Sequence, residues 1–220
     1  VVARPWGAGS PGHQCRGRGV GAWRAMLPVY DAAVELATLV AHRARVDGDL
    51  IRVDDFLNHR VEPGIMRTIG TALAERFRAE EPDLVLTAEA SGIPPGMTCA
   101  LELDIPLVYA RKYLGTGARY AFWRDVVSPT KGVEYRVEVA RRVLPPGLRV
   151  LVVDDFLSGG RTAEALGEIT VEGGSEPVGF GFVIEKRYQA GRERLERHGW
   201  PVHSLVMVAS ITDGAIELEP

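Results

Sequence analysis

The sequence contains little cysteine, little lysine and no long uninterrupted apolar segment. Its two cysteines, Cys15 and Cys99, form neither a disulfide framework nor a metal-ligand spacing, which is typical of a reducing cytosol. No apolar run reaches the roughly 18–20 residues that span a bilayer, and residues 1–25 lack the apolar core of a secretion signal. The formal charge of −3 argues against a nucleic-acid surface, which usually requires an excess of basic residues. We therefore expect a cytoplasmic protein whose partners include neither a membrane nor nucleic acid.

The remaining composition is that of one globular domain. With 220 residues, 46% of them apolar and 25% charged, the chain can form a sizeable core and a small appended subdomain. Residues 1–25 are rich in Gly, Arg and Pro and show no periodicity, whereas a helical pattern begins at Met26. We expect residues 1–25 to be a disordered or non-native leader and residues 26–220 to form a single domain.

The apolar residues beyond Met26 follow the periods of helices and buried strands. Helical spacing runs from Val29 to Val46, and a second helix begins at Pro63. Short apolar runs, typical of buried parallel strands, then alternate with helical intervals. The runs are 84–88, 106–110, 149–153, 178–184 and 204–209, and the intervals are 92–103, 161–173 and 189–199. The predicted fold class is α/β, with a mainly parallel sheet flanked by helices.

Residues 111–139 do not fit this alternation. The segment is too long and too polar for a simple crossover, and it ends in a strand-like pattern. Long loops in compact domains are usually functional. We therefore expect a flexible loop over about 111–139 that ends in a strand.

The pentapeptide VDDFL occurs twice, at residues 53–57 and 153–157, with different flanks. The second copy ends a buried strand and runs through SGGRT into a helix. The first copy has neither a buried strand before it nor glycines behind it. Because ligands of open α/β sheets bind at the carboxyl ends of strands, the second copy is the candidate site and the first is not its duplicate.

Residues 154–162 carry the groups that a ribose 5-phosphate requires. Gly159 and Gly160 allow a tight turn into a helix N-terminus, where backbone N–H groups bind phosphate, and hydroxyls on either side add donors. Asp154 and Asp155 can accept hydrogen bonds from ribose hydroxyls. An acidic pair after a strand also occurs in response-regulator receiver domains, but there it lies near the chain start and no Gly-rich loop follows it.

These residues resemble a known family. VLVVDDFLSGGRT is similar to the phosphoribosyl-pyrophosphate signature of type I phosphoribosyltransferases. RVDDFLNH, EASGIPP, YARK and VIEKRYQAGRERL occur in the order of that family, so the resemblance extends from about residue 30 to 210. The combination is most similar to the xanthine phosphoribosyltransferase branch, with adenine phosphoribosyltransferase as a neighbour.

The resemblance implies a fold and a reaction. The fold is a type I phosphoribosyltransferase sheet with a small hood, mainly residues 45–62, and a mobile loop at about 111–139, in a homodimer. In the reaction, a purine base displaces pyrophosphate from C1 of 5-phosphoribosyl 1-pyrophosphate and forms the nucleoside 5'-monophosphate of purine salvage. Mg²⁺ accompanies phosphoribosyl pyrophosphate, with no ligand directly from the protein. Xanthine is the expected base.

The resemblance also implies three groups of site residues. The catalytic residues are Asp154, Asp155 and Lys112. The residues expected to bind phosphoribosyl pyrophosphate are Ser158, Gly159, Gly160, Arg161, Thr162, Glu89, Ala90, Ser91, Gly92 and Arg111. The residues expected to contact the base are Ile51, Asn58 and Lys186.

The scarcity of lysine supports part of this assignment independently. The chain has 26 basic residues of Lys and Arg type, of which only Lys112, Lys131 and Lys186 are lysines. In a chain that favours arginine so strongly, the lysines that remain are expected to have been kept for a function. All three lie in segments that the resemblance marks as functional. Lys112 is expected near the pyrophosphate, Lys131 on the mobile loop and Lys186 at the purine's six-position oxygen.

Several alternatives stay open at this stage. The base could be adenine, hypoxanthine or guanine, which differ from xanthine by one or two exocyclic groups. The protein could be a non-catalytic regulator with the same fold, or an enzyme acting on orotate or uracil. The aromatic cluster Tyr120, Phe122 and Trp123 could stack on a base, exclude water or pack against a partner subunit.

Overall fold

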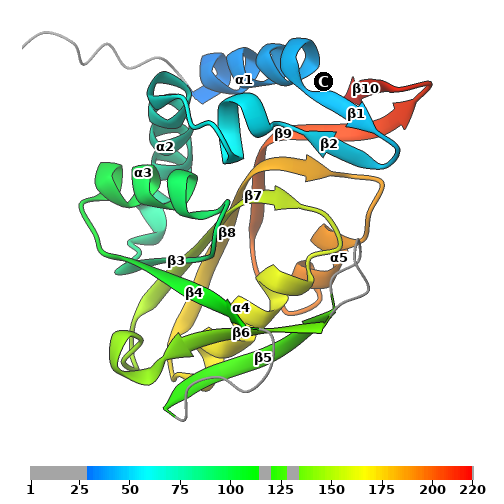
Figure 1. The fold of residues 1–220 in the computed structure, drawn as a ribbon. Coiled ribbons are helices and arrows are strands. Elements are labelled where there is room, and N and C mark those ends of the chain that lie inside the picture. Colours follow the sequence, from blue (N-terminus) through cyan, green and yellow to red (C-terminus); the bar gives the residue numbers. More distant parts are fainter. Residues whose placement is uncertain (1–28, 114–119, 128–133, 220) are drawn as a thin grey trace, which may run out of the picture.

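A computed structural model describes residues 29–113, 120–127 and 134–219. Within these residues, eight strands form one sheet in the order β10-β9-β8-β7-β3-β4-β6-β5 (Figure 1). The sheet strands are β3 (Leu84–Ala88), β4 (Leu107–Tyr113), β5 (Ala121–Val127), β6 (Glu134–Ala140), β7 (Arg149–Leu157), β8 (Glu176–Lys186), β9 (Val202–Thr212) and β10 (Ala215–Leu218). The helices are α1 (Val29–Arg43), α2 (Pro63–Phe77), α3 (Ile93–Leu103), α4 (Arg161–Glu172) and α5 (Gly191–Glu196).

The centre of the sheet is parallel and its two edges are antiparallel. β9, β8, β7, β3 and β4 pair in parallel, whereas β6 and β5 on one side and β10 on the other pair antiparallel. Two further strands, β1 (Arg45–Asp47) and β2 (Leu50–Arg52), form a separate hairpin. The predicted α/β class with a mainly parallel sheet is confirmed.

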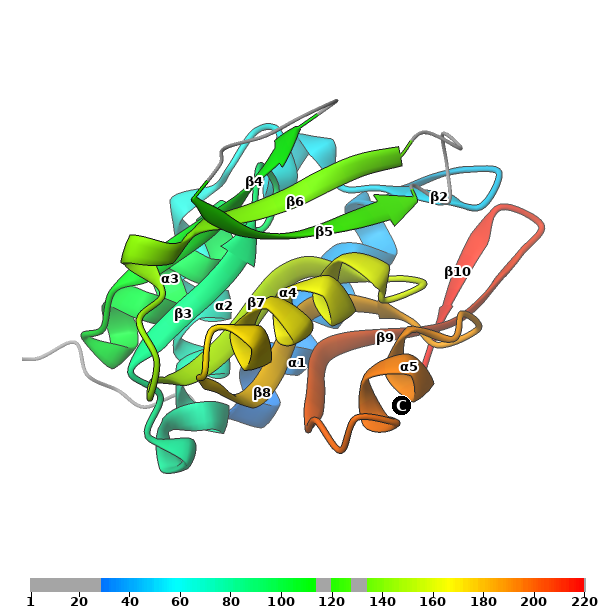
Figure 2. The same cartoon turned by 90° about the horizontal axis from the view of Figure 1, so that it is seen from below.

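The sheet divides the core into two layers. In β7, Leu151 and Val153 pack into the layer that contains α1, α2 and α3. Val150 and Val152, which leave the strand on the other face, pack into the layer that contains α4 and α5. Figure 2 shows α4 and α5 in front of the sheet, with α1 and α2 behind it. Both faces are covered, which explains why the central strands are continuously apolar in the sequence.

Residues 45–62, which we call the hood, lie at the end of the sheet where β7 and β8 finish (Figure 1). The hood consists of the β1–β2 hairpin and a short π-helix, η1 (Asp54–Asn58). Phe56 and Leu57 of η1 are buried and fix the hood to the core of α1 and α2. The first VDDFL copy therefore forms part of the hood, and its acidic pair faces outward, with Asp54 paired to Arg45.

The structure corrects the prediction in two places. The helix expected from Val29 to Val46 ends at Arg43, because Val46 pairs with Ile51 in a hairpin whose turn contains Gly48 at φ 59°. The segment 111–139 ends in a strand, β6, as expected, but the part expected to be a flexible loop contains a further regular strand, β5, and together β5 and β6 extend the sheet beyond β4. Two short 3₁₀ helices also occur within the described residues: η2 (Arg78–Glu80) directly follows α2, and η3 (Arg141–Val143) directly follows β6.

Two findings bear on the absences noted in the sequence. No helix within the described ranges has both the length and the apolar character needed to cross a bilayer. Cys99 is buried, and this burial raises the pKa of its thiol to about 12, so the reactive thiolate is scarce at neutral pH.

Candidate functional site

The topology places the candidate site between β3 and β7. These strands are parallel neighbours, and the chain proceeds from β3 to β4 on one side and from β7 to β8 on the other. Such a reversal of strand order opens a crevice at the carboxyl ends, where α/β proteins bind ligands. The loops that follow the two strands are 89–92 and 158–162. We call residues 89–92 the cis loop and residues 158–162 the phosphate loop.

The phosphate loop borders a hollow of about 170 Å³ at the start of α4. Gly160 has φ 72°, a conformation that favours glycine, and a Cβ there would also collide with the backbone of Gly191. The first N–H groups of a helix lack partners within the helix, and the helix dipole makes this end positive. The hollow therefore has the size and the polarity to hold a phosphate group.

Side chains from the β5–β6 hairpin and from β4 approach the phosphate loop. The hydroxyls of Tyr135 in β6 and Thr162 share a hydrogen bond of 2.7 Å. The Lys112 ammonium lies 5.4 Å from the centre of the Tyr135 ring. Tyr135 also lines the hollow and was not predicted as a site residue. By contrast, the exposed Arg161 guanidinium donates to the Val127 carbonyl at 3.4 Å.

The cis loop is built from close backbone contacts. The peptide bond between Glu89 and Ala90 is cis. The Lys112 backbone N–H donates to Glu89 Oε1 at 2.6 Å, which ties the loop to β4. A Cβ at Gly92 would collide with the hydroxyl of Thr87 and the carboxylate of Asp154. Glycine at position 92 thus lets the cis loop approach the end of β7.

The acidic pair at the end of β7 connects three segments of the chain. The Asp155 carboxylate accepts one hydrogen bond from Ser91 Oγ at 3.0 Å and another from Asn58 Nδ2 at 2.9 Å. The Asp155 backbone N–H donates to Asp154 Oδ1 at 2.9 Å. The hood, the cis loop and β7 therefore meet at Asp155, which is buried.

Asp154 lines the hollow, and its carboxyl group has a raised pKa. Part of its carboxyl surface is open to the hollow, but the surrounding protein atoms remove most of its water. This desolvation, followed by the negative charge of Asp155, raises the pKa of Asp154 well above its ordinary value, and the Lys112 charge offsets only part of the shift. A carboxyl of this kind can hold a proton or favour a nearby positive charge.

Replacing Asp154 by asparagine should stabilise the fold while it removes the charge from the site. A carboxyl whose pKa is raised by folding is protonated in both states in acid, and it lowers stability as the pH rises towards that raised pKa. We expect Asp154→Asn to melt roughly 2–4 °C higher than the wild type at pH 8, the shift that about 1 kcal/mol produces in a domain of this size. The difference should shrink at pH 4. Thermal unfolding at both pH values tests this, and equal melting temperatures at both would contradict it.

Two of the predicted base contacts lie where the hood meets β8. The Lys186 ammonium, at the end of β8, donates to the Asp49 carbonyl in the β1–β2 turn at 2.6 Å. Burial lowers the pKa of Lys186 from its ordinary value. Ile51 in β2 is buried against the core, beside these groups in the hood. The third residue, Asn58, donates to Asp155, so one of the three predicted base contacts is joined directly to the acidic pair.

Several predicted residues lie apart from these contacts. Arg111 and Lys112 are neighbours in β4, so their side chains leave opposite faces of the strand. The Arg111 guanidinium carbon lies 5.3 Å from the centre of the Tyr113 ring. Lys131 lies outside the described residues. The aromatic cluster is split: Phe122 is 5% exposed and belongs to the core, whereas Trp123 lies under the Arg136 guanidinium at 3.9 Å. Tyr120 is 83% exposed.

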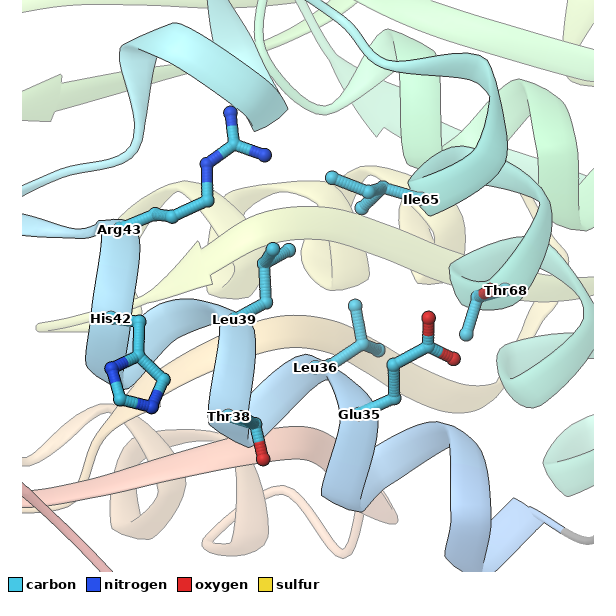
Figure 3. Close-up of a pocket in the computed structure, with 8 residues that line it drawn as sticks. All are labelled: Glu35, Leu36, Thr38, Leu39, His42, Arg43, Ile65 and Thr68. Carbon is cyan, nitrogen blue, oxygen red and sulfur yellow. The ribbon is translucent and has the colours of Figure 1, made fainter.

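A larger hollow of about 390 Å³ lies between α1 and α2, away from the predicted residues (Figure 3). Leu36, Leu39 and Ile65 give it an apolar wall. None of the predicted site residues lines it. The smaller hollow at the phosphate loop, where charged and hydroxyl groups converge, is therefore the better candidate for chemistry.

The geometry defines a class of protein: an α/β domain with a phosphate loop and an acidic pair at the switch point of its sheet, suited to a sugar phosphate. A family model described as "Phosphoribosyl transferase domain" matches residues 54–200. A xanthine phosphoribosyltransferase of Chloroflexus aurantiacus is 42% identical over 77% of this chain and 80% of its own length. Another, of an Exiguobacterium species, is 44% identical over 74% of this chain and 84% of its own.

A solved structure agrees with these relatives. The crystal structure of adenine phosphoribosyltransferase from Rhodothermus marinus matches with a TM-score of 0.67 and 28% identity, over 81% of this chain and 99% of that one. The chain belongs to the phosphoribosyltransferase family. The resemblance inferred from the sequence motifs is confirmed.

Proposed function

We propose that this protein is a purine phosphoribosyltransferase whose preferred base is xanthine. The observation that carries the proposal is the meeting of the hood, the cis loop and β7 at Asp155. One site would then hold a sugar phosphate and a base next to each other. Relatives named xanthine phosphoribosyltransferase, at 42% and 44% identity over most of the chain, support the choice of base.

The phosphoribosyl pyrophosphate would lie across the carboxyl ends of β3 and β7. The phosphate loop, Ser158, Gly159, Gly160, Arg161 and Thr162, would bind the 5-phosphate. Asp154 and Asp155 would contact the ribose hydroxyls and favour the positive charge that builds on the ring when the C1–oxygen bond breaks. The cis loop, Glu89, Ala90, Ser91 and Gly92, would bind the pyrophosphate, with Lys112 and Arg111 supplying positive charge.

The purine would lie beneath the hood. Lys186 would exchange the Asp49 carbonyl for the six-position oxygen of the base, since both are oxygen acceptors for the same buried ammonium. The Asn58 amide can donate and accept at once, which suits an oxo-purine edge. Ile51 would supply an apolar neighbour. Adenine carries an amino group at the six position, so it offers Lys186 a donor where xanthine offers an acceptor.

Mg²⁺ would enter with phosphoribosyl pyrophosphate. Oxygen atoms are the ligands that Mg²⁺ prefers, and this edge of the sheet is rich in carboxylate oxygens. Both oxygens of Asp155 already accept hydrogen bonds from Ser91 and Asn58, which favours a metal held by the substrate rather than by the protein. The bound ion would neutralise charge on the departing pyrophosphate.

The remaining assignments follow the family. We propose a cytoplasmic homodimer, with residues 26–220 as one phosphoribosyltransferase domain and residues 45–62 as its hood. Residues 1–25, proposed as a leader without function, lie outside the described residues, as do parts of the proposed mobile loop at 111–139. The strands β5 and β6 would form the fixed part of that loop.

A direct assay tests the proposed function. Purified protein receives Mg²⁺, phosphoribosyl pyrophosphate and one of xanthine, guanine, hypoxanthine or adenine, and nucleotide formation is followed by chromatography. We expect xanthine to give the highest kcat/KM. A preference for adenine would keep the reaction but contradict the roles of Lys186 and Asn58. Binding of phosphoribosyl pyrophosphate without product from any base would favour a regulator with this fold.

A further inference from the structure

Arg194 in α5 contacts the phosphate loop without lining the hollow. Its Nε donates to the Gly159 carbonyl at 2.8 Å. One of its terminal nitrogens donates to Glu164 Oε2, in the first turn of α4, at 2.9 Å. The guanidinium, with 31% of its side chain exposed, is thus held between the loop and the helix that follows it.

The bond to Gly159 fixes the orientation of one peptide unit. The peptide between Gly159 and Gly160 is trans, so its carbonyl and its N–H point in opposite directions. Because Arg194 holds the Gly159 carbonyl, the Gly160 N–H is directed away from Arg194. Both glycines line the hollow, whereas Arg194 does not. In the part of the chain that the structure describes, no acceptor takes the Gly160 N–H.

Within the described residues, no hydrogen bond other than the one from Arg194 involves Gly159. A Cβ at Gly159 would meet no atom within 4 Å, so no neighbouring group crowds that side of its α-carbon. Two successive glycines have wide conformational freedom, and the peptide between them could rotate. A rotated peptide would present its carbonyl oxygen, with partial negative charge, to a phosphate. Gly160, in contrast, is restrained by its contact with Gly191.

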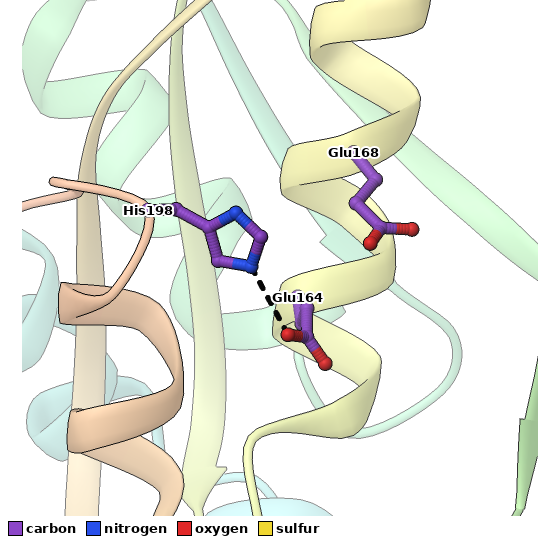
Figure 4. A group of neighbouring side chains, drawn as sticks. All are labelled: Glu164, Glu168 and His198. Carbon is purple, nitrogen blue, oxygen red and sulfur yellow. Dashed lines mark hydrogen bonds and ion pairs between the residues drawn. The ribbon is translucent and has the colours of Figure 1, made fainter.

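Arg194 is itself held in place by an ion-pair network. His198 Nε2 lies 3.1 Å from Glu164 Oε1 (Figure 4). The His198 ring also stacks on the Trp200 ring, with 4.2 Å between centroids. Glu168, drawn beside them, pairs with Arg124 at 2.7 Å. The group of Glu164, Glu168 and His198 has the spacing of a metal site, but arginines already neutralise both carboxylates. These side chains therefore form an ion-pair network, and its member Glu164 helps to hold Arg194 beside the phosphate loop.

We propose that Arg194 is a positioning residue for the 5-phosphate: it holds the Gly159 carbonyl so that the Gly160 N–H donates to the phosphate. Arg194 acts through the Gly159–Gly160 peptide and does not touch the substrate. The inference rests on the proposed function, because it assumes that the hollow binds the 5-phosphate of phosphoribosyl pyrophosphate.

Calorimetric titrations with ribose 5-phosphate and, separately, with pyrophosphate and Mg²⁺ test this role. The variants are Arg194→Ala, Arg194→Lys and the control Arg197→Ala, which removes an exposed arginine one turn along. We expect Arg194→Ala to weaken ribose 5-phosphate about tenfold, the effect of one charge-assisted hydrogen bond. Its affinity for pyrophosphate should stay unchanged. Arg194→Lys, which keeps a donor for the carbonyl, should recover part of the loss, and Arg197→Ala should bind both ligands normally.

In turnover, Arg194→Ala should raise KM for phosphoribosyl pyrophosphate and leave kcat close to that of the wild type. A folded Arg194→Ala protein that binds ribose 5-phosphate as tightly as the wild type would overturn the role, and so would an equal loss for pyrophosphate. If Arg194→Ala does not fold, Arg194→Lys carries the test: weaker ribose 5-phosphate binding supports the role and unchanged binding overturns it. Failure of the wild type to bind ribose 5-phosphate would instead contradict the proposed phosphate site.

Discussion

Asp155→Asn should reduce kcat by about a hundredfold or more while the protein stays folded. The substitution removes the negative charge that would favour the cationic ribose ring. It also replaces one carboxylate oxygen by an amide that donates, although both Asp155 oxygens accept hydrogen bonds from Ser91 and Asn58. One of these two contacts must be lost or rearranged. Steady-state kinetics with xanthine and phosphoribosyl pyrophosphate, together with circular dichroism, measure the two effects.

Asp125→Asn is the matched control for this variant. Asp125 lies in β5, where its exposed carboxylate pairs with Arg136 at 3.0 Å, and exposed pairs of this kind contribute little to stability. We expect its kinetics to equal those of the wild type. Near-normal turnover by Asp155→Asn would remove the ribose assignment. A large loss in both variants would indicate that activity is sensitive to any charge change.

Lys186→Met should lower kcat/KM for xanthine by between about tenfold and a hundredfold, the range for a hydrogen bond from a buried charged donor. Methionine keeps an unbranched apolar side chain of similar length, so the packing under the hood is largely retained. The six-position oxygen of the base then lacks its donor. Parallel assays with adenine serve as the internal control, because adenine has no oxygen at that position. An unchanged ratio of xanthine to adenine turnover would contradict the placement of Lys186.

The lowered pKa of Lys186 adds a pH dependence to this prediction. Because burial disfavours the ammonium, the lysine loses its proton at a lower pH than an exposed lysine does. The charged ammonium donor is present below that pKa, and as the pH rises through it the ammonium becomes an uncharged amine, which is a weaker donor. KM for xanthine should therefore increase in alkaline solution for the wild type. The part of this increase that comes from Lys186 should be missing in Lys186→Met, so its KM should rise less than that of the wild type over the same pH range.

The sequence predicted the parts of the site that are continuous in the chain. The phosphate loop follows a strand, and the apolar run with the acidic and glycine residues after it suffices to locate the loop. The cis loop also follows a strand, but only the family resemblance marked it as part of the site. The partners of these loops come from distant segments. Asn58 meets Asp155 across 97 positions and Arg194 meets Gly159 across 35, and no local pattern encodes such distances.

The β5–β6 hairpin shows a second limit of sequence reasoning. Both strands carry many charged residues because one face of this sheet edge is exposed, and β5 therefore resembled a polar loop, whereas the strand pattern at the end of the segment, now β6, was recognised. Tyr135 was missed as well, because its contact with Thr162 depends on the register of β6 against β4. The only sequence signal for it was an aromatic residue within a polar stretch.

The alternation of side chains along β7 makes two identical neighbours chemically different. Val150, Val152 and Asp154 leave one face of the strand, towards α4 and the hollow, whereas Leu151, Val153 and Asp155 leave the other. One aspartate, Asp154, therefore borders the hollow, and the other, Asp155, is buried and hydrogen-bonded to the hood. A comparison of sequences that allows a one-residue gap within this strand would still pair aspartate with aspartate, yet it would match acids with different environments. Aspartates in related chains are therefore best matched by the face of the strand from which they leave. The valines and leucines that precede them in the strand alternate between the two faces and show which face that is.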